Sequence, residues 1–334
     1  MSQEELSSRW QRQATILEFP DPQVPEGVFL DTDQLPADPE NKVHLAHGEI
    51  QIGDGKTYYR GFFPENRSEE GLGLFFSGYS GFLKSSEPLG MALAQAGLAN
   101  IVVDPVRRYN GSIKEDLTNP QLLPVLTMEA VVRDLPHNRR VTHKTPDGMR
   151  AIHEQKVLAA HSMGGLSAPE YALKHVNDVE SLFLLQAVVR GAAIRRRIAE
   201  AVIKGEMLGA VRHELIPYVF GRDIERTPKN VFRMLRYFGI GDPRATRITR
   251  PIGEGISCLT ADMRPTLKKL GETSVKTVYI QAGKDVLVDP GDDIEDHVDK
   301  LVVLQQYGHL VEQVRPKIVA KALLDARHEL AQAA

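Results

Sequence analysis

Three residues of this sequence, each placed just after an apolar segment, have side chains that could perform chemistry together. They are Ser162 after the run 157–160, Asp285 after 275–281, and His309 after 301–305. A serine hydroxyl is a poor nucleophile at neutral pH, so it needs a general base whose own orientation is fixed by a carboxylate. The order serine, aspartate, histidine along the chain is typical of such a triad on a strand-to-helix turn. The pattern therefore predicts Ser162 as a nucleophile, His309 as its base and Asp285 as the orienting acid.

The segment around Ser162 has the composition of a sharp turn between a strand and a helix. Val157 to Ala160 is apolar enough for a strand buried on both faces, and apolar residues recur at helical spacing after the turn. Gly164 and Gly165 leave room for a strained backbone at the serine. Such a turn, a nucleophile elbow, projects the serine hydroxyl from the end of a sheet, and the N–H of Met163 can then face a developing oxyanion.

A second oxyanion donor is expected from the turn that follows another strand. Residues 72–76 are apolar and lead into a turn at 77–81 that contains two glycines. The backbone N–H of Tyr79 in this turn is the natural partner of that of Met163. An ordinary strand-to-helix loop is the alternative interpretation of the same residues.

Alternative interpretations also exist for the acid and the base. Asp285 could be a turn residue that hydrogen-bonds its own backbone. Asp289, Asp292 and Asp293 compete with it, although they are explained most simply as first-turn or capping residues of a helix expected at 290–298.

His161 is the one serious rival to His309 as the base. Because it directly precedes Ser162, its side chain is expected to point away from the serine and to shape the pocket wall instead.

Composition limits the classes of function. The 334 residues carry a net charge of −3, which gives no overall attraction to nucleic acid or membrane. The single cysteine, Cys258, cannot form an intramolecular disulfide and is expected to be a small buried residue without reactivity. The first residues lack the basic and apolar parts of a signal peptide, and no run is long enough for a membrane span. We therefore expect a soluble, cytoplasmic protein.

The pattern along the chain predicts three parts. Residues 1–42 are polar and rich in proline, as in an arm lying on the main body. Residues 43–189 and 265–334 carry a front hairpin and then short apolar runs alternating with helical stretches, the last of them at 311–329. This alternation predicts a mostly parallel sheet with helices on both faces. Residues 190–264 break this alternation and are expected to form an inserted helical cap over the carboxyl ends of the strands, with helices at 192–208, 210–220 and 229–238.

These motifs resemble those of the α/β-hydrolase superfamily over residues 43 to 330. The segment 160–164 is similar to its nucleophile elbow, 77–79 to its first oxyanion loop, 283–288 to its acid loop and 308–316 to its histidine loop and last helix. The resemblance implies an α/β-hydrolase fold with Ser162, Asp285 and His309 as catalytic residues and Tyr79 and Met163 as oxyanion donors. Two residues depart from the family pattern: Ser77 stands where histidine is usual, and Ala160 where glycine is usual.

The expected function is that of a serine hydrolase. A serine at the turn speaks against the dehalogenases and epoxide hydrolases of the superfamily, which use aspartate there, and implies attack on the acyl carbon of a small-molecule carboxylic ester. Transfer to another acceptor, or cleavage of an amide, thioester or carbon–carbon bond, is compatible with the same triad, as is a ligand-binding protein with little turnover. No cofactor or metal is expected, and the oligomeric state stays open.

The expected cap is basic, although the whole chain is slightly acidic. From residue 190 to 270 there are 17 Lys and Arg against 8 Asp and Glu, a net of +9. A solvated helical face that pairs with the acidic body is the favoured interpretation, and attraction of an anionic substrate is the alternative.

Overall fold

A computed structural model describes residues 15–16, 42–52, 55–78, 83–103, 121–137, 146–206, 249–291 and 293–333. Its centre is one sheet with the strand order β1-β9-β8-β7-β6-β4-β5-β3-β2. The first seven strands in this order, β1-β9-β8-β7-β6-β4-β5, are all parallel to their neighbours. Strand β3 pairs antiparallel with both β5 and β2. The predicted class, a mostly parallel sheet fronted by an antiparallel hairpin, is therefore confirmed.

The strands are short and mostly apolar. Their bounds are β1 Thr15–Ile16, β2 Val43–Ile52, β3 Gly55–Pro64, β4 Leu72–Phe76, β5 Asn100–Val103, β6 Lys156–His161, β7 Val179–Leu185, β8 Lys276–Ala282 and β9 Lys300–Leu304. Every residue of β4, β5 and β6 is buried. Strands covered on both faces need apolar side chains on both, which explains why these segments do not alternate.

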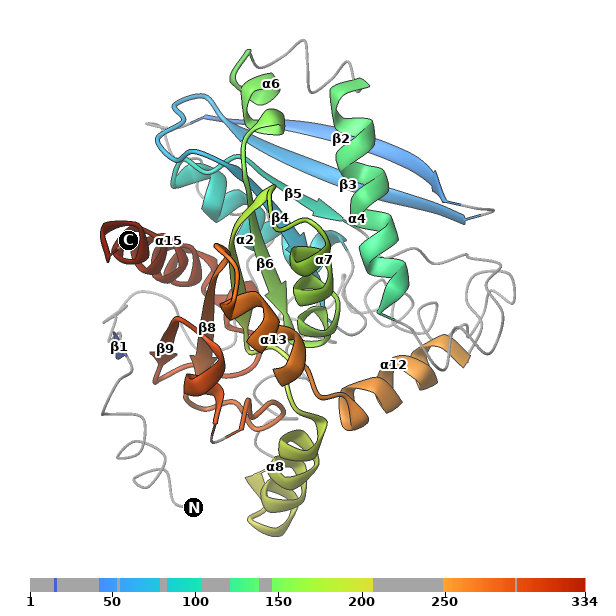
Figure 1. Ribbon diagram of the computed structural model, residues 1–334, viewed down its shortest axis with the longest axis vertical. Helices are drawn as coiled ribbons and strands as arrows, with labels where there is room; N and C mark the ends of the chain where they lie inside the picture. Colours follow the sequence, from blue (N-terminus) through green and yellow to red (C-terminus); the bar gives the residue numbers. More distant parts are fainter. Residues whose placement is uncertain are drawn as a thin grey trace, which may run out of the picture.

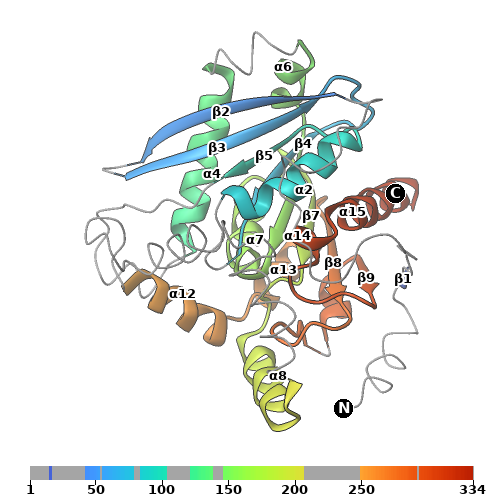
Figure 2. The same cartoon turned by 180° about the vertical axis from the view of Figure 1, so that it is seen from behind.

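Helices cover both faces of the sheet. The helices are α2 Leu83–Gln95, α4 Leu122–Asp134, α6 Pro146–His153, α7 Ala168–Lys174, α8 Gly191–Ile203, α12 Thr249–Thr260, α13 Arg264–Gly271, α14 Val311–Val314 and α15 Pro316–Ala333. One apolar layer joins α4, α7 and α13 to the sheet, and these helices lie in front in Figure 1. A second layer joins α2 and α15 to the other face, seen in Figure 2. The result is a three-layer α/β/α arrangement.

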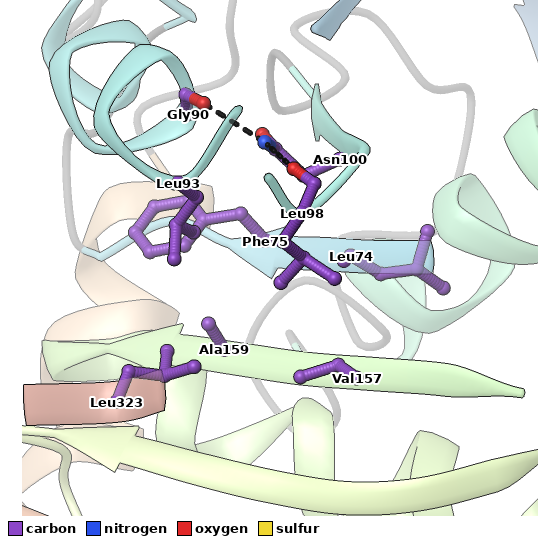
Figure 3. A pocket seen from close by; sticks show the side chains of 10 residues that line it. Leu74, Phe75, Gly90, Leu93, Leu98, Asn100, Val157, Ala159 and Leu323 are labelled. Atoms are coloured by element: carbon purple, nitrogen blue, oxygen red, sulfur yellow. Dashed lines mark hydrogen bonds between the residues drawn. The ribbon is translucent and has the colours of Figure 1, made fainter. Parts of the chain in front are cut away.

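A small pocket lies inside the second apolar layer, between the sheet, α2 and α15 (Figure 3). Leu93 of α2 and Leu323 of α15 face β4 and β6 across it. Its polar group is the buried side chain of Asn100, whose amide donates to the carbonyl oxygens of Gly90 at 2.8 Å and Leu98 at 3.0 Å. These bonds fix the middle of α2 and the turn after it to the start of β5.

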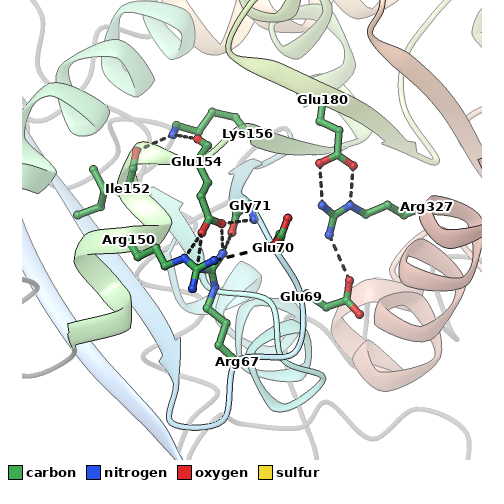
Figure 4. A network of polar contacts seen from close by, with 10 residues as sticks. All are labelled: Arg67, Glu69, Glu70, Gly71, Arg150, Ile152, Glu154, Lys156, Glu180 and Arg327. Atoms are coloured by element: carbon green, nitrogen blue, oxygen red, sulfur yellow. Dashed lines mark hydrogen bonds and ion pairs between the residues drawn. The ribbon is translucent and has the colours of Figure 1, made fainter. Parts of the chain in front are cut away.

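Salt bridges join the elements at the amino ends of the strands (Figure 4). Arg327 of α15 binds both carboxylate oxygens of Glu180 in β7, each at 2.7 Å, and reaches Glu69 at 3.2 Å. Arg67 forms a second such contact with Glu154, at 2.9 Å between Nη1 and Oε1. The charged network therefore lies at the amino ends of the strands, whereas Ser162 follows the carboxyl end of β6.

Two helical predictions need correction. The helix expected at 290–298 is only the four-residue 3-10 helix η5, Ile294–His297. The helix expected from Val311 to Glu329 is two helices, α14 and α15, which meet at Arg315, because Pro316 begins a new helix more readily than it continues one. None of the described helices is both long and apolar enough to cross a membrane.

Candidate active site

Ser162 occupies a strained turn between β6 and the helical residues that follow it. It is the first residue of the 3-10 helix η3, Ser162–Leu166, and its φ of +51° lies in the left-handed region that non-glycine residues rarely adopt. The carbonyl oxygen of Ser162 accepts a hydrogen bond of 2.8 Å from the N–H of Val188, just beyond β7. Strain of this kind persists only where the surroundings enforce it, as at many reactive residues.

Glycines next to the turn are required by close packing. A Cβ on Gly164 would lie 2.3 Å from the carbonyl oxygen of Phe76 at the end of β4. A Cβ on Gly165 would lie 2.7 Å from that of Ala187, so neither site accepts a side chain without movement of the backbone. The expectation that these glycines leave room for the turn is confirmed by these distances.

The structure brings Ser162, His309 and Asp285 into one hydrogen-bonded line. Nε2 of His309 lies 3.1 Å from Oγ of Ser162, and Nδ1 of His309 lies 2.8 Å from Oδ2 of Asp285. All three are buried, with exposed fractions of 8%, 6% and 4% for the serine, histidine and aspartate. Because the carboxylate of Asp285 accepts a hydrogen bond from the Nδ1–H of His309, the neutral imidazole presents a lone pair at Nε2 to the serine hydroxyl. In this arrangement His309 can accept the proton of the Ser162 hydroxyl at Nε2 while Asp285 stabilises the resulting charge.

The loop after β8 holds the carboxylate of Asp285 in place. Its Oδ1 accepts backbone hydrogen bonds from Leu287 at 2.8 Å and Val288 at 3.0 Å, which leaves Oδ2 for His309. Asp285 therefore makes the backbone hydrogen bonds of a turn residue with one oxygen and contacts His309 with the other. Asp289, a competitor for the acid, instead pairs with Arg196 at 3.2 Å.

The oxyanion donors are only partly described. Tyr79 lies outside the described residues. Gly78, its neighbour, packs directly on the site, since a Cβ there would lie 2.8 Å from Cβ of Ser162. Met163 is the second residue of η3, and N–H groups in the first turn of a helix have no carbonyl partner within that helix. The assignment of Tyr79 and Met163 as donors stays a prediction.

His161 contacts a carboxyl group and the backbone of His309. Nδ1 of His161 lies 3.2 Å from Oε1 of Glu312, and its Nε2 lies 3.0 Å from the carbonyl oxygen of His309. Its side chain is therefore engaged with the loop that carries the expected base, and it is 5% exposed. The sequence offers one signal for this pair, which is a glutamate three residues after His309 at the start of an apolar helix.

Helix α8, at the start of segment 190–264, lies beside the acid loop, because Arg197 contacts the backbone of Asp285. Helix α8 follows β7, and α12 packs against it, because a Cβ on Gly191 would lie 2.3 Å from the backbone of Leu259. Both helices lie together at one end of the molecule in Figures 1 and 2. The helices expected at 210–220 and 229–238 lie outside the described residues.

The basic side chains of α8 are engaged within the protein. Arg195 donates to the carbonyl oxygen of Leu259. Arg197 pairs with Glu206 at 3.2 Å, and its Nε donates to the carbonyl oxygen of Asp285 at 3.3 Å. These contacts agree with a basic face that pairs with its own protein.

Neither Cys258 nor a metal cluster adds chemistry in the described part of the chain. Cys258 on α12 is partly buried, and burial raises the pKa of its thiol to about 12, so the reactive thiolate is scarce at neutral pH. The described residues contain no group of three or more His, Cys, Asp or Glu side chains arranged to hold a metal ion.

Comparisons with known proteins place the chain by its fold. No protein-family model and no curated protein matches the sequence. Among solved structures, proline iminopeptidase from Mycobacterium smegmatis is 17% identical, with a TM-score of 0.55 over 86% of this chain and 100% of that one. The epoxide hydrolase VrEH1 from Vigna radiata is 15% identical, with a TM-score of 0.53 over 86% and 98%. Est816, described as an N-acyl homoserine lactone degrading enzyme, is 17% identical, with a TM-score of 0.53 over 83% and 99%. The chain thus has the α/β-hydrolase fold.

Proposed function

We propose that this protein is a serine hydrolase that cleaves a carboxylic ester through an acyl-enzyme on Ser162. The observation that carries the proposal is the line from Oγ of Ser162 through His309 to Asp285, with contacts of 3.1 and 2.8 Å. His309 takes the serine proton as Oγ attacks the acyl carbon, and returns it to the leaving alcohol. Asp285 keeps Nδ1 protonated and stabilises the imidazolium. Water, activated by the same histidine, then releases the acid.

The backbone N–H groups of Met163 and Tyr79 are the proposed donors to the oxyanion. The close approach of Gly78 to Ser162 supports this, because Gly78 directly precedes Tyr79 in the chain. Donors fixed in the backbone need no rearrangement when the negative charge develops, and each contributes about a hundredfold or more to the rate.

We also propose that segment 190–264 caps the site and selects the acyl group. The support is that α8 leaves the carboxyl end of β7, where Ser162 is held by Val188, and that Arg197 contacts the acid loop. Ligands of open α/β sheets bind at this end of the strands.

Hydrolysis of p-nitrophenyl esters of graded chain length tests the proposal. We expect a burst of p-nitrophenol equal to the enzyme concentration, followed by slower turnover, because the acyl-enzyme forms before it is hydrolysed. Ser162→Ala should lose the burst and at least about 10⁴-fold in kcat. An added alcohol or amine that diverts the acyl group faster than water would instead identify a transferase. A native protein without any turnover of these esters would contradict the ester proposal.

A further inference from the structure

A second carboxyl–imidazole pair, which the proposed reaction does not use, lies next to the triad. It consists of His161 and Glu312, 5% and 1% exposed, and the rings of His161 and His309 have their centres 4.9 Å apart. The pair connects three elements, because His161 ends β6, Glu312 lies on α14, and His309 lies in the loop between β9 and α14.

The contacts of this pair determine how many protons it must hold. A carbonyl oxygen only accepts, so Nε2 of His161, 3.0 Å from the carbonyl oxygen of His309, must carry a proton. The contact of 3.2 Å between Nδ1 and Oε1 of Glu312 also needs a proton, on either the nitrogen or the oxygen. Both contacts therefore exist together only when the pair holds two protons. With one proton fewer, one contact becomes a repulsion between lone pairs.

Electrostatics agrees with a neutral acid and a neutral imidazole. Burial raises the pKa of Glu312 to about 7, and burial holds the pKa of His161 well below its ordinary value. Gln313 donates to Oε1 of Glu312 at 3.0 Å, which lowers the pKa of Glu312 by less than burial raises it. A carboxylic acid hydroxyl can accept this bond while it donates to His161. Oε2 of Glu312 is buried and has no hydrogen-bond partner among the described residues, an arrangement that disfavours a carboxylate further.

Other charges near Glu312 have smaller effects than burial. His309 lowers the pKa of Glu312 and Asp285 raises it. Helices α2 and α15 pack against α14. Their described charged groups with known partners are Glu87, which pairs with Arg60, Lys321 with Asp325, Arg327 with Glu180 and Glu69, His328 with Glu69, and Glu329 with Lys300.

We propose that Glu312 and His161 are positioning residues that hold the backbone of His309 through their two shared protons, so that loss of one proton loosens His309 and slows the reaction. The inference rests on the proposed function, in which His309 is the base. A base held by one contact fewer spends less time in line with Oγ of Ser162, which lowers kcat and leaves KM almost unchanged.

Glu312→Gln tests this directly, because an amide N–H can donate to Nδ1 of His161 at every pH and cannot be lost. The ratio of wild-type kcat to that of Glu312→Gln should be constant at low pH and fall about tenfold as pH rises through about 7. Taking the ratio removes the ionisation of His309 common to both proteins. Glu312→Ala, which cannot donate, should be about tenfold slower than Glu312→Gln at pH 6.

The chain offers a matched control in the pair Glu129–His175, in which Oε1 and Nε2 lie 3.0 Å apart, joining α4 to α7. Glu129→Gln removes a carboxylate from a histidine that does not contact His309, so the corresponding ratio should not vary with pH. A ratio for Glu312→Gln that is equally flat would overturn the proposal.

A measurement that needs no catalysis separates this inference from the proposed function. In Ser162→Ala, the ¹⁵N shifts of His161 at pH 6 should show a proton on Nε2. A neutral ring protonated only on Nδ1 would overturn the positioning role, whether or not the native protein hydrolyses esters.

Discussion

At the scale of single residues, the site depends on side chains whose protons are fixed by their neighbours. Both carboxyl groups that face an Nδ1 are buried. Asp285, which faces His309, binds two backbone N–H groups through its other oxygen, whereas Oε2 of Glu312, which faces His161, has no hydrogen-bond partner among the described residues. Backbone donors favour an ionised carboxyl group, and burial disfavours one. Two similar carboxyl–imidazole pairs are therefore suited to different tasks.

Asp285→Asn tests the first pair. An amide that donates toward Nδ1 would impose the wrong tautomer on His309, so we expect kcat for ester hydrolysis to fall by about 10³- to 10⁴-fold with the fold retained. The control is Asp289→Asn, a loop aspartate whose partners are Arg196 and the N–H of Gly291. Little change in kcat is expected for Asp289→Asn. Equal losses of kcat in the two variants would mean that Asp285 is not the orienting acid.

Glu312 should also make stability depend on pH. Its pKa is raised from 4.5 to about 7 in the folded protein, so its contribution to the free energy of unfolding is full below about 4.5 and is lost as pH rises through about 7. Urea denaturation of wild type and Glu312→Gln across this range should show a difference that changes by more than 1 kcal/mol, at about 1.4 kcal/mol per pKa unit. A constant difference would place the folded pKa near its ordinary value.

At the scale of elements, the site is made by strand ends that meet. Residues 157–160, 275–281 and 301–305 were predictable as strands because strands buried on both faces are short apolar runs, and β6, β8 and β9 cover most of these residues. The glutamate after His309 was visible in the sequence, but its pairing with His161 was not predictable, since it depends on where α14 lies relative to the end of β6. The prediction of a helix at 290–298 was wrong because the aspartates there do not cap a helix. Asp289 binds Arg196 and the N–H of Gly291, and Asp293 binds Arg264.

The turn at Ser162 can be tested by adding one methyl group. Gly164→Ala places a Cβ 2.3 Å from a backbone oxygen of β4, so it should reduce the free energy of unfolding by about 2–3 kcal/mol and lower activity through displacement of Ser162. Gly255→Ala makes the same change on α12, where no atom of the described residues lies within 4 Å of the new Cβ. That control should be neutral or stabilising by about 0.5–1 kcal/mol. Equal melting temperatures of the two variants would argue against the close packing of the turn.

At the scale of the whole molecule, the candidate site and the salt-bridge network lie at opposite ends of the strands. Ser162, Asp285 and His309 follow the carboxyl ends of β6, β8 and β9, whereas the salt bridges of Arg327 and Arg67 join elements at the amino ends. The residues at the carboxyl ends were predicted from sequence motifs with a known mechanism. The salt bridges at the amino ends could not be predicted, because charged residues in polar segments look alike in the sequence whether or not they pair in the fold.

Arg327→Met should affect stability without affecting chemistry. Loss of a mostly buried arginine leaves Glu180 and Glu69 without its charge, so we expect unfolding to become easier by about 2 kcal/mol. The kcat of the folded fraction should stay unchanged. Lys321→Met removes an exposed pair with Asp325 on the same helix and should cost less than about 0.5 kcal/mol. A loss of kcat in fully folded Arg327→Met would show that the salt bridges at the amino ends of the strands affect the site at their carboxyl ends.

The most direct test of the central claim is covalent labelling with a fluorophosphonate, which reacts with activated serines. Mass spectrometry of the native protein should find one adduct per chain, on the peptide that contains Ser162. Ser162→Ala should not be labelled, and His309→Ala should be labelled at least about a hundredfold more slowly, because the hydroxyl loses its base. Absence of labelling in the native protein, or an adduct at another serine, would contradict the account.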